Sequence, residues 1–214
     1  MKAIFALLFA AIAGMSAFGQ DINLPAPKDK VGLDLADAIK ARSTSRSFVA
    51  KDIPLADLAT ILWAANGLRP VDSVSSASKA GRNVAYSGDV AYINVYVFTS
   101  KGAYLYVPEK NLLKQVATKD VRAQVTSEFI KTSPALVLFS VDLAKAPSFL
   151  KGAMLDSVAT GTAGSAAENV SLVASSLKLS SIIMYNINFA AVPALASFGK
   201  EEKPLSFLQL GYAK

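Results

Sequence analysis

Two arginines, Arg42 and Arg46, lie four residues apart, and Ser43, Thr44 and Ser45 stand between them. Guanidinium groups form charge-assisted hydrogen bonds, and their planar donor fork matches the oxygens of a phosphate. The segment follows a short stretch with helical spacing, so it would leave a helix end as a compact loop. The pattern therefore predicts an anion site, with phosphate as the expected group. A solvated helix end with local salt bridges is the usual alternative for such a basic pair, and it stays open here.

The composition limits the chemistry that this site can perform. The 214-residue chain has no cysteine and no histidine. Ser-His and Cys-His catalysis, disulfides and most zinc sites are therefore excluded. The net charge is +6, but lysines and arginines are spread along the chain without a dense basic run or interleaved aromatic residues. Nucleic-acid binding is therefore not expected, and a small anionic molecule is the expected partner.

Residues 1–19 have the pattern of a secretory signal peptide. Lys2 precedes an apolar run over residues 3–15, and small residues follow it. We expect cleavage after Gly19, export to the periplasm or the exterior, and an extended arm over residues 20–32. The apolar run is short for a membrane span, and the chain has no cysteine to carry a lipid. No stable membrane anchor is therefore expected.

Residues 33–214 mix helical and strand patterns and predict one α+β domain. Pro54 favours the start of a helix and Asn66-Gly67 its end. A loop rich in Ser, Gly and Ala over 69–91 is long enough to suggest a functional role. Helices are expected over 33–41, 55–65, 118–130, 152–177 and 189–198, and strands over 92–99, 103–107, 134–141, 180–186 and 205–212. The long Ala- and Val-rich helix would lie against a central mixed or antiparallel sheet.

Five segments form an ordered pattern along the chain. They are Arg42-Ser43-Thr44-Ser45-Arg46-Ser47-Phe48 with Leu62-Trp63-Ala64-Ala65-Asn66-Gly67, Arg82-Asn83-Val84-Ala85-Tyr86-Ser87-Gly88-Asp89, Gly102-Ala103-Tyr104-Leu105-Tyr106-Val107-Pro108, Gly164-Ser165-Ala166-Ala167-Glu168-Asn169-Val170-Ser171-Leu172, and Leu208-Gln209-Leu210-Gly211-Tyr212. In order and spacing they resemble the nitroreductase family, in particular its short SagB-like flavin branch. The resemblance covers most of the chain, from about Leu33 to Tyr212.

The resemblance implies a fold, an assembly and a cofactor. It implies a central sheet flanked by helices with a long core helix, a homodimer, and FMN at the subunit interface. NADH or NADPH would supply a hydride that passes through the flavin to a small acceptor. The implied cofactor-binding residues are Arg42, Ser43, Thr44 and Arg46 for the phosphate, Ala85, Tyr86, Ser87 and Asp89 against the ring of the flavin across the interface, Met184, Tyr185 and Asn186 by the other face of the ring, and Lys214 near the position of the family's basic tail.

The expected function is an exported FMN-dependent oxidoreductase of the nitroreductase type with an unknown small acceptor. No catalytic side chain and no metal ligand is assigned, because the flavin carries the hydride chemistry. One alternative is a secreted binding or structural protein that keeps the fold without flavin, with Tyr86 and Asp89 filling the pocket. Another is a flavin-free anion-binding protein that uses Arg42 and Arg46.

Overall fold

The computed structural model describes residues 19–70, 80–126 and 133–214. The predicted signal peptide lies outside the described residues, apart from Gly19. Residues 71–79 of the predicted loop and residues 127–132 of one predicted helix also lie outside them.

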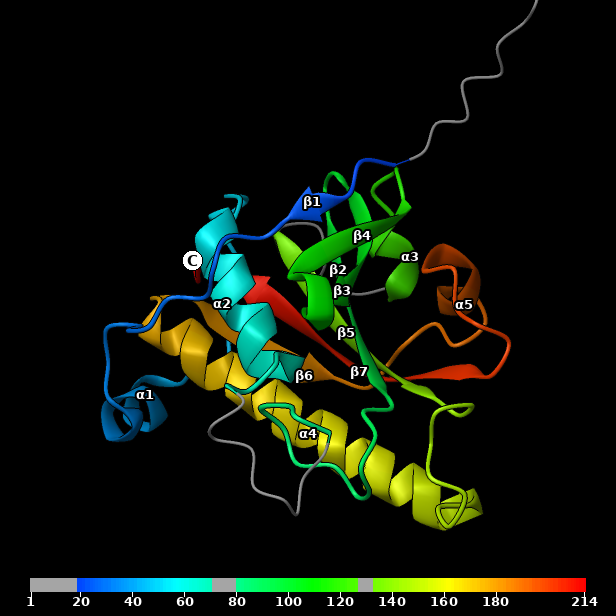
Figure 1. Ribbon diagram of the computed structural model, residues 1–214. Helices are drawn as coiled ribbons and strands as arrows, with labels where there is room; N and C mark the ends of the chain where they lie inside the picture. Colours follow the sequence, from blue (N-terminus) through cyan, green and yellow to red (C-terminus); the bar gives the residue numbers. More distant parts are fainter. Residues whose placement is uncertain (1–18, 71–79, 127–132) are drawn as a thin grey trace, which may run out of the picture.

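A seven-stranded sheet forms the centre of the molecule, and its strand pairs are all antiparallel (Figure 1). The strands follow the order β1-β4-β3-β2-β5-β7-β6 across the sheet. They are β1 (Ile22–Asn23), β2 (Ile93–Thr99), β3 (Gly102–Val107), β4 (Leu112–Ala117), β5 (Ala135–Asp142), β6 (Ser180–Met184) and β7 (Glu202–Gly211). Of the two arrangements expected, the antiparallel one is observed. Because β6 is an edge strand, the loop that follows the first helix can lie along its free side.

Helices cover both faces of the sheet, as Figure 1 shows for α2 and α4 on one side and for α3 and α5 on the other. The helices are α1 (Leu35–Ala41), α2 (Leu55–Asn66), the 3-10 turn η2 (Pro108–Lys110), α3 (Arg122–Val125), α4 (Gly152–Ser176) and α5 (Val192–Leu195). Alternation along β2 explains the two layers, because successive strand side chains point to opposite faces. Val95 and Val97 join the core under α2 and α4, whereas Tyr96 and Phe98 join the core under α3 and α5.

The long helix α4 packs closely because its inner face is made of small residues. Ala159, Ala163 and Ala167 are at most 1% exposed, and Val170 is fully buried beside them. Small side chains let the helix backbone approach the sheet and α2, where dense packing maximises van der Waals contact. The helix predicted over 152–177 is therefore confirmed.

The apolar run in β5 is also explained by the two layers. Its residues from Ala135 to Val141 are all buried, because the strand lies between β2 and β7 with helices over both faces. The predicted strand over 134–141 is confirmed. Its partners are antiparallel, so a continuous apolar run marks burial on both faces here without a parallel sheet.

Two predicted helices are shorter than expected. Of the described residues in 118–130, only Arg122 to Val125 are helical. The guanidinium of Arg122 bonds Asp120 at 2.9 and 2.7 Å and also donates to Pro134 O at 3.2 Å, which holds this segment against the start of β5. The helix predicted over 189–198 begins only at Val192, because the backbone of Asn188 donates to Val125 O at 2.8 Å and is held outside the helix.

Three strand predictions need correction. The strand β4 was not predicted, because its sequence Leu112–Ala117 shows no clear alternation of apolar and polar residues. The last strand begins at Glu202, three residues before the predicted start at Leu205. The strand predicted over 180–186 ends at Met184, so Tyr185 and Asn186 lie in the loop beyond it.

The arm before α1 closes the other edge of the sheet. Ile22 and Asn23 pair with β4, and Asn111 Nδ2 donates to Leu24 O at 2.8 Å and to Pro25 O at 3.2 Å. A two-residue edge strand of this kind leaves few unpaired backbone groups for another chain to pair with.

Candidate functional site

The anion-binding segment begins where α1 ends. Asp34 caps this helix by accepting a hydrogen bond from Asp37 N at 2.8 Å, and the chain leaves helical geometry at Arg42 (φ −58°, ψ 122°). The helix is tied to the long helix behind it, because Ser175 Oγ donates to Ala38 O at 3.2 Å. The end of α1, where Arg42 leaves the helix, is thus held against α4.

The loop after α1 lies along the free side of β6. Thr44 forms a parallel bridge with Ser181, and Ser45 N donates to Ser181 O at 3.3 Å. Ser45 Oγ then donates to Ser47 O at 2.8 Å and closes a short turn. These contacts hold the loop beside β6, and Arg42, Thr44 and Arg46 line the same cavity there.

The end of the loop is anchored by Phe48 and by the last residues of the chain. Phe48 is fully buried and forms an antiparallel bridge with Ala213. Lys214 N donates to Ser47 O at 3.1 Å. Lys214, which is far from the arginines in sequence, is therefore brought beside the loop that carries them.

A cavity of about 240 Å³ lies between this loop, α4 and β6. Its lining residues are Arg42, Thr44, Arg46, Glu168, Ser171, Ser181, Ile182 and Ile183. Two hydroxyls form part of this lining and are fixed by a chain of hydrogen bonds. Ser181 Oγ donates to Ser171 Oγ at 3.0 Å, and Ser171 Oγ donates to Ala167 O at 3.0 Å.

The charges of the cavity are only partly paired. Arg42 Nε lies 4.0 Å from Glu168 Oε1, and the two side chains are 39% and 50% exposed. Within the described parts of the chain, Arg46 forms no ion pair or side-chain hydrogen bond. Two guanidinium groups and a threonine hydroxyl at one cavity suit the oxygens of a phosphate monoester, whereas the two serine hydroxyls already donate within the protein. The donor set therefore fits the phosphate of FMN, with Glu168 as the one acidic group that opposes it.

The three residues implied for the flavin ring follow the cavity along β6. The strand runs from Ser181 at the cavity to Met184, a distance of about 10 Å for three residues. Gln209 Nε2 donates to Met184 Sδ at 3.1 Å and orients the thioether. Beyond the strand, Tyr185 is 58% exposed and Asn186 is also exposed. The phosphate of FMN would thus lie beside Ser181 at the start of β6, and the ring would lie beside Met184 at its end.

The loop from Ala85 to Asp89 is not part of this cavity in its own chain. The Tyr86 hydroxyl donates to Asn66 Oδ1 at 2.9 Å, and its ring meets Tyr92 edge-on with centroids 5.0 Å apart. Burial raises the pKa of Tyr86 well above its ordinary value, so the phenol stays protonated. Ala85 and Ser87 are exposed beside it. The resemblance implies that this loop acts across a subunit interface, and the single chain is compatible with that arrangement.

Asp89 lines a different cavity, of about 410 Å³, between the start of β2 and the end of β3. Arg82, Glu109 and Lys145 are also among its lining residues. Arg82 pairs with Glu109, and this contact, together with burial that opposes it, leaves the pKa of Glu109 below its ordinary value. The pair ties the loop that carries Ala85 to the turn after β3.

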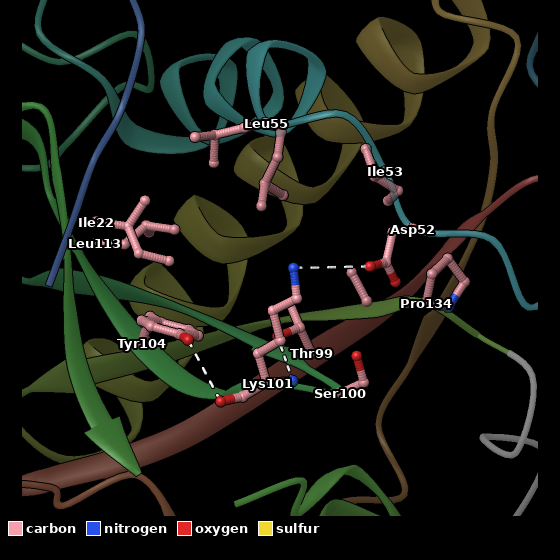
Figure 2. Close-up of a pocket in the computed structure, with 12 residues that line it drawn as sticks. Ile22, Asp52, Ile53, Leu55, Thr99, Ser100, Lys101, Tyr104, Leu113 and Pro134 are labelled. Carbon is pink, nitrogen blue, oxygen red and sulfur yellow. Dashed lines mark hydrogen bonds and ion pairs between the residues drawn. The ribbon is translucent and has the colours of Figure 1, made fainter. Parts of the chain in front are cut away.

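A third cavity, also of about 240 Å³, lies between the first turn of α2 and the β2–β3 hairpin. Figure 2 shows its apolar walls, among them Ile22 and Leu55, and the ion pair of Lys101 with Asp52 at its mouth, 3.9 Å apart. Both charged side chains are more than 70% exposed. None of the predicted site residues lines this cavity, so the arginine cavity remains the candidate functional site.

The model of the nitroreductase family matches residues 39–212. The chain belongs to the nitroreductase family. The match begins just before Arg42 and ends at Tyr212, so it includes all the predicted site residues except Lys214. The resemblance seen in the sequence is thereby confirmed at the level of the family, and the SagB-like branch stays a prediction.

Solved structures with the nitroreductase fold resemble this chain over most of its length. A protein from Ralstonia eutropha JMP134, described as a nitroreductase, is 24% identical, with a TM-score of 0.83 over 92% of this chain and 91% of its own. The Escherichia coli microcin synthetase McbBCD complex contains a chain that is 16% identical, with a TM-score of 0.68 and coverage of 100% and 85%. The NADPH:FMN oxidoreductase of Vibrio harveyi is 17% identical, with a TM-score of 0.60 and coverage of 84% and 69%. These likenesses show the shared fold. A comparison with curated proteins gave no match.

Sequence reasoning missed five residues that line this candidate site, three of them polar, namely Glu168, Ser171 and Ser181, and two of them apolar, Ile182 and Ile183. Glu168 and Ser171 lie three residues apart on α4 and therefore on one face of it. That spacing was visible in the sequence, but nothing local indicated that the face would meet Arg42. Among the residues that the structure describes, no cluster of acidic side chains could hold a metal ion, and no helix has the length and apolar character needed to cross a membrane.

Proposed function

We propose that this protein is an exported, homodimeric FMN-dependent oxidoreductase that transfers a hydride from a reduced nicotinamide to a small acceptor. One observation carries the proposal: Arg42, Thr44 and Arg46 converge with two serine hydroxyls on one cavity beside β6. This donor set, in a chain that belongs to the nitroreductase family, supports a phosphate site for FMN.

Different residues of the chain would bind the phosphate and the ring of FMN. Arg42 and Arg46 would neutralise the phosphate, while the hydroxyl of Thr44 would donate a hydrogen bond to one of its oxygens. Met184 and the exposed Tyr185 would flank the ring. When bound, FMN supplies the two-electron chemistry, so the protein needs no nucleophile of its own.

Exposed apolar side chains support the homodimer. Leu35 and Ile39 on α1 are 67% and 57% exposed, and Phe149, Met154 and Phe189 are 64%, 59% and 57% exposed. Leu35 and Ile39 are four residues apart and share one face of α1, and a large apolar face left exposed on a soluble protein commonly marks an association surface. Association would also allow the loop around Tyr86 to reach a second flavin site. The pattern of residues 1–19 supports export.

The flavin-free alternative has one specific observation in its favour. Glu168 places a carboxylate in the cavity, 4.0 Å from Arg42, and so provides an internal anion where the proposed function requires a phosphate. A secreted binding protein with a degenerate pocket would tolerate such a group.

Titration of FMN against the chain from Gln20 onward decides between the two. Flavin fluorescence and the visible spectrum would be followed, with the double variant Arg42→Ala/Arg46→Ala as the matched control. Saturable binding below about 10 µM that the double variant loses supports the oxidoreductase. Absence of binding at about 100 µM contradicts it and favours the flavin-free protein.

A further inference from the structure

Glu168 is the only acidic residue among those that line the arginine cavity. It lies on α4, and its Oε1 is 4.0 Å from Arg42 Nε. The lining therefore carries two positive charges and one negative charge, and the negative charge sits beside one of the two guanidinium groups.

The carboxylate of Glu168 contributes little to the stability of the fold. An ion pair that is 39% and 50% exposed at a separation of 4.0 Å contributes between about 0 and 1 kcal/mol to stability. Within the described residues, Glu168 accepts no hydrogen bond that its removal would leave unsatisfied. An amide of the same shape should therefore be tolerated at this position.

A phosphate in this cavity would be repelled by the carboxylate of Glu168. The two anions would share Arg42 at a distance shorter than the screening length of physiological salt, which is about 8 Å. The uncharged parts of a flavin would feel it much less, because the ring would lie toward Met184, about 10 Å along the strand.

We propose that Glu168 weakens the discrimination of this site between phosphorylated and unphosphorylated flavins, so that FMN is preferred over riboflavin less strongly than the two arginines alone would allow. The inference rests on the proposed flavin function. Glu168 acts as a specificity-determining residue by partly neutralising Arg42 before any ligand arrives. Removal of its charge should make the cavity more selective for the phosphate.

The test compares Glu168→Gln with the native chain by titrating both FMN and riboflavin. Asp156→Asn is the matched control, because Asp156 is exposed on the same helix, outside the cavity, and its replacement changes the net charge equally. We expect Glu168→Gln to tighten FMN binding by about fivefold to tenfold at low salt, to leave riboflavin binding unchanged, and to lose the gain in 0.5 M salt. Asp156→Asn should leave both affinities unchanged. Thermal unfolding of the two variants checks that they are folded.

The failure of this inference differs from the failure of the proposed function. If Glu168→Gln leaves the ratio of the two affinities unchanged while Arg42→Ala/Arg46→Ala abolishes FMN binding, the flavin function stands and the role of Glu168 is wrong. Equal tightening of FMN and riboflavin also overturns that role. If neither the native chain nor Glu168→Gln binds either flavin, both proposals are wrong. If Glu168→Gln binds FMN and the native chain does not, the proposed function is wrong, and Glu168 excludes the phosphate instead of tuning its affinity.

Discussion

Tyr86 is the residue that the flavin-free alternative would use to fill the pocket, but its side chain is turned into the core of its own chain. Its hydroxyl bonds Asn66 and its ring packs edge-on against Tyr92. We expect Tyr86→Phe to lower the free energy of unfolding by about 1 kcal/mol, because a buried hydrogen bond is lost and Asn66 Oδ1 is left without its donor. FMN affinity should not change. Urea unfolding and FMN titration measure the two effects. A variant with native stability and tighter FMN binding would instead show that the Tyr86 side chain blocks the flavin pocket.

Single residues of the site were predictable only where the signal is local. Arg42 and Arg46 were found because their spacing and the helix end before them lie within one short segment. Ser181 and Glu168 belong to β6 and α4, and they reach the cavity only because Thr44 pairs with the edge strand and α1 packs on α4. No pattern within either segment encodes that meeting.

At the scale of elements, two glycines should respond in opposite ways to the same substitution. Gly102 turns the β2–β3 hairpin with φ +137°, and a Cβ there would lie 2.2 Å from Ala117 O, a backbone atom that cannot move aside. Gly161 lies within α4, and a Cβ there would meet nothing within 4 Å. We expect Gly102→Ala to destabilise the protein by about 2 kcal/mol or more, and Gly161→Ala to stabilise it by about 0.5 to 1 kcal/mol.

Denaturant unfolding of the two variants checks this pair, with circular dichroism at room temperature confirming that both are folded. A stabilised Gly102→Ala would show that the hairpin can relax around the new side chain. A destabilised Gly161→Ala would mean that a second chain packs against that face of α4, since nothing in the described part of this chain lies there.

The elements that could be predicted are those whose own residues, within one segment, indicate that the segment is buried. Helix α4 and strand β5 are long, and their small or apolar residues reflect packing on both sides. Strand β4 escaped prediction because it lies near the sheet edge, where one neighbour is a two-residue strand and five of its six residues are only partly buried or exposed. Helix α3 was overestimated because tertiary contacts of Arg122, rather than helix propensity, fix that segment.

At the scale of the whole molecule, the strand order joins segments that are distant in sequence. β5 lies between β2 and β7, and β7 separates it from β6. Local patterns predict strands but not this order, because pairing depends on which faces the helices cover. The resemblance to the nitroreductase family implied a central mixed or antiparallel sheet with a long core helix, and the strand order itself was not predicted.

The helices on both faces of the sheet bury tyrosines in each core, and this burial makes the protein less stable at alkaline pH. Burial raises the pKa of Tyr106 from 10.0 to about 12, and it raises the pKa of Tyr86 and Tyr96 further. In the unfolded chain these phenols ionise near pH 10. Because the folded protein holds the protons more tightly, their contribution to stability is complete below pH 10 and is lost as the pH rises through the folded pKa values.

We therefore expect the free energy of unfolding to fall steeply above about pH 10, and Tyr106→Phe to make that fall smaller by about 2 to 3 kcal/mol by pH 12. Phenylalanine keeps the buried ring but has no proton to lose. Urea unfolding between pH 8 and pH 12 measures the difference, and Tyr185→Phe serves as the control because that side chain is 58% exposed. If the control flattened the curve as much as Tyr106→Phe did, the alkaline sensitivity would arise from charge on the whole chain and not from phenols held in its two cores.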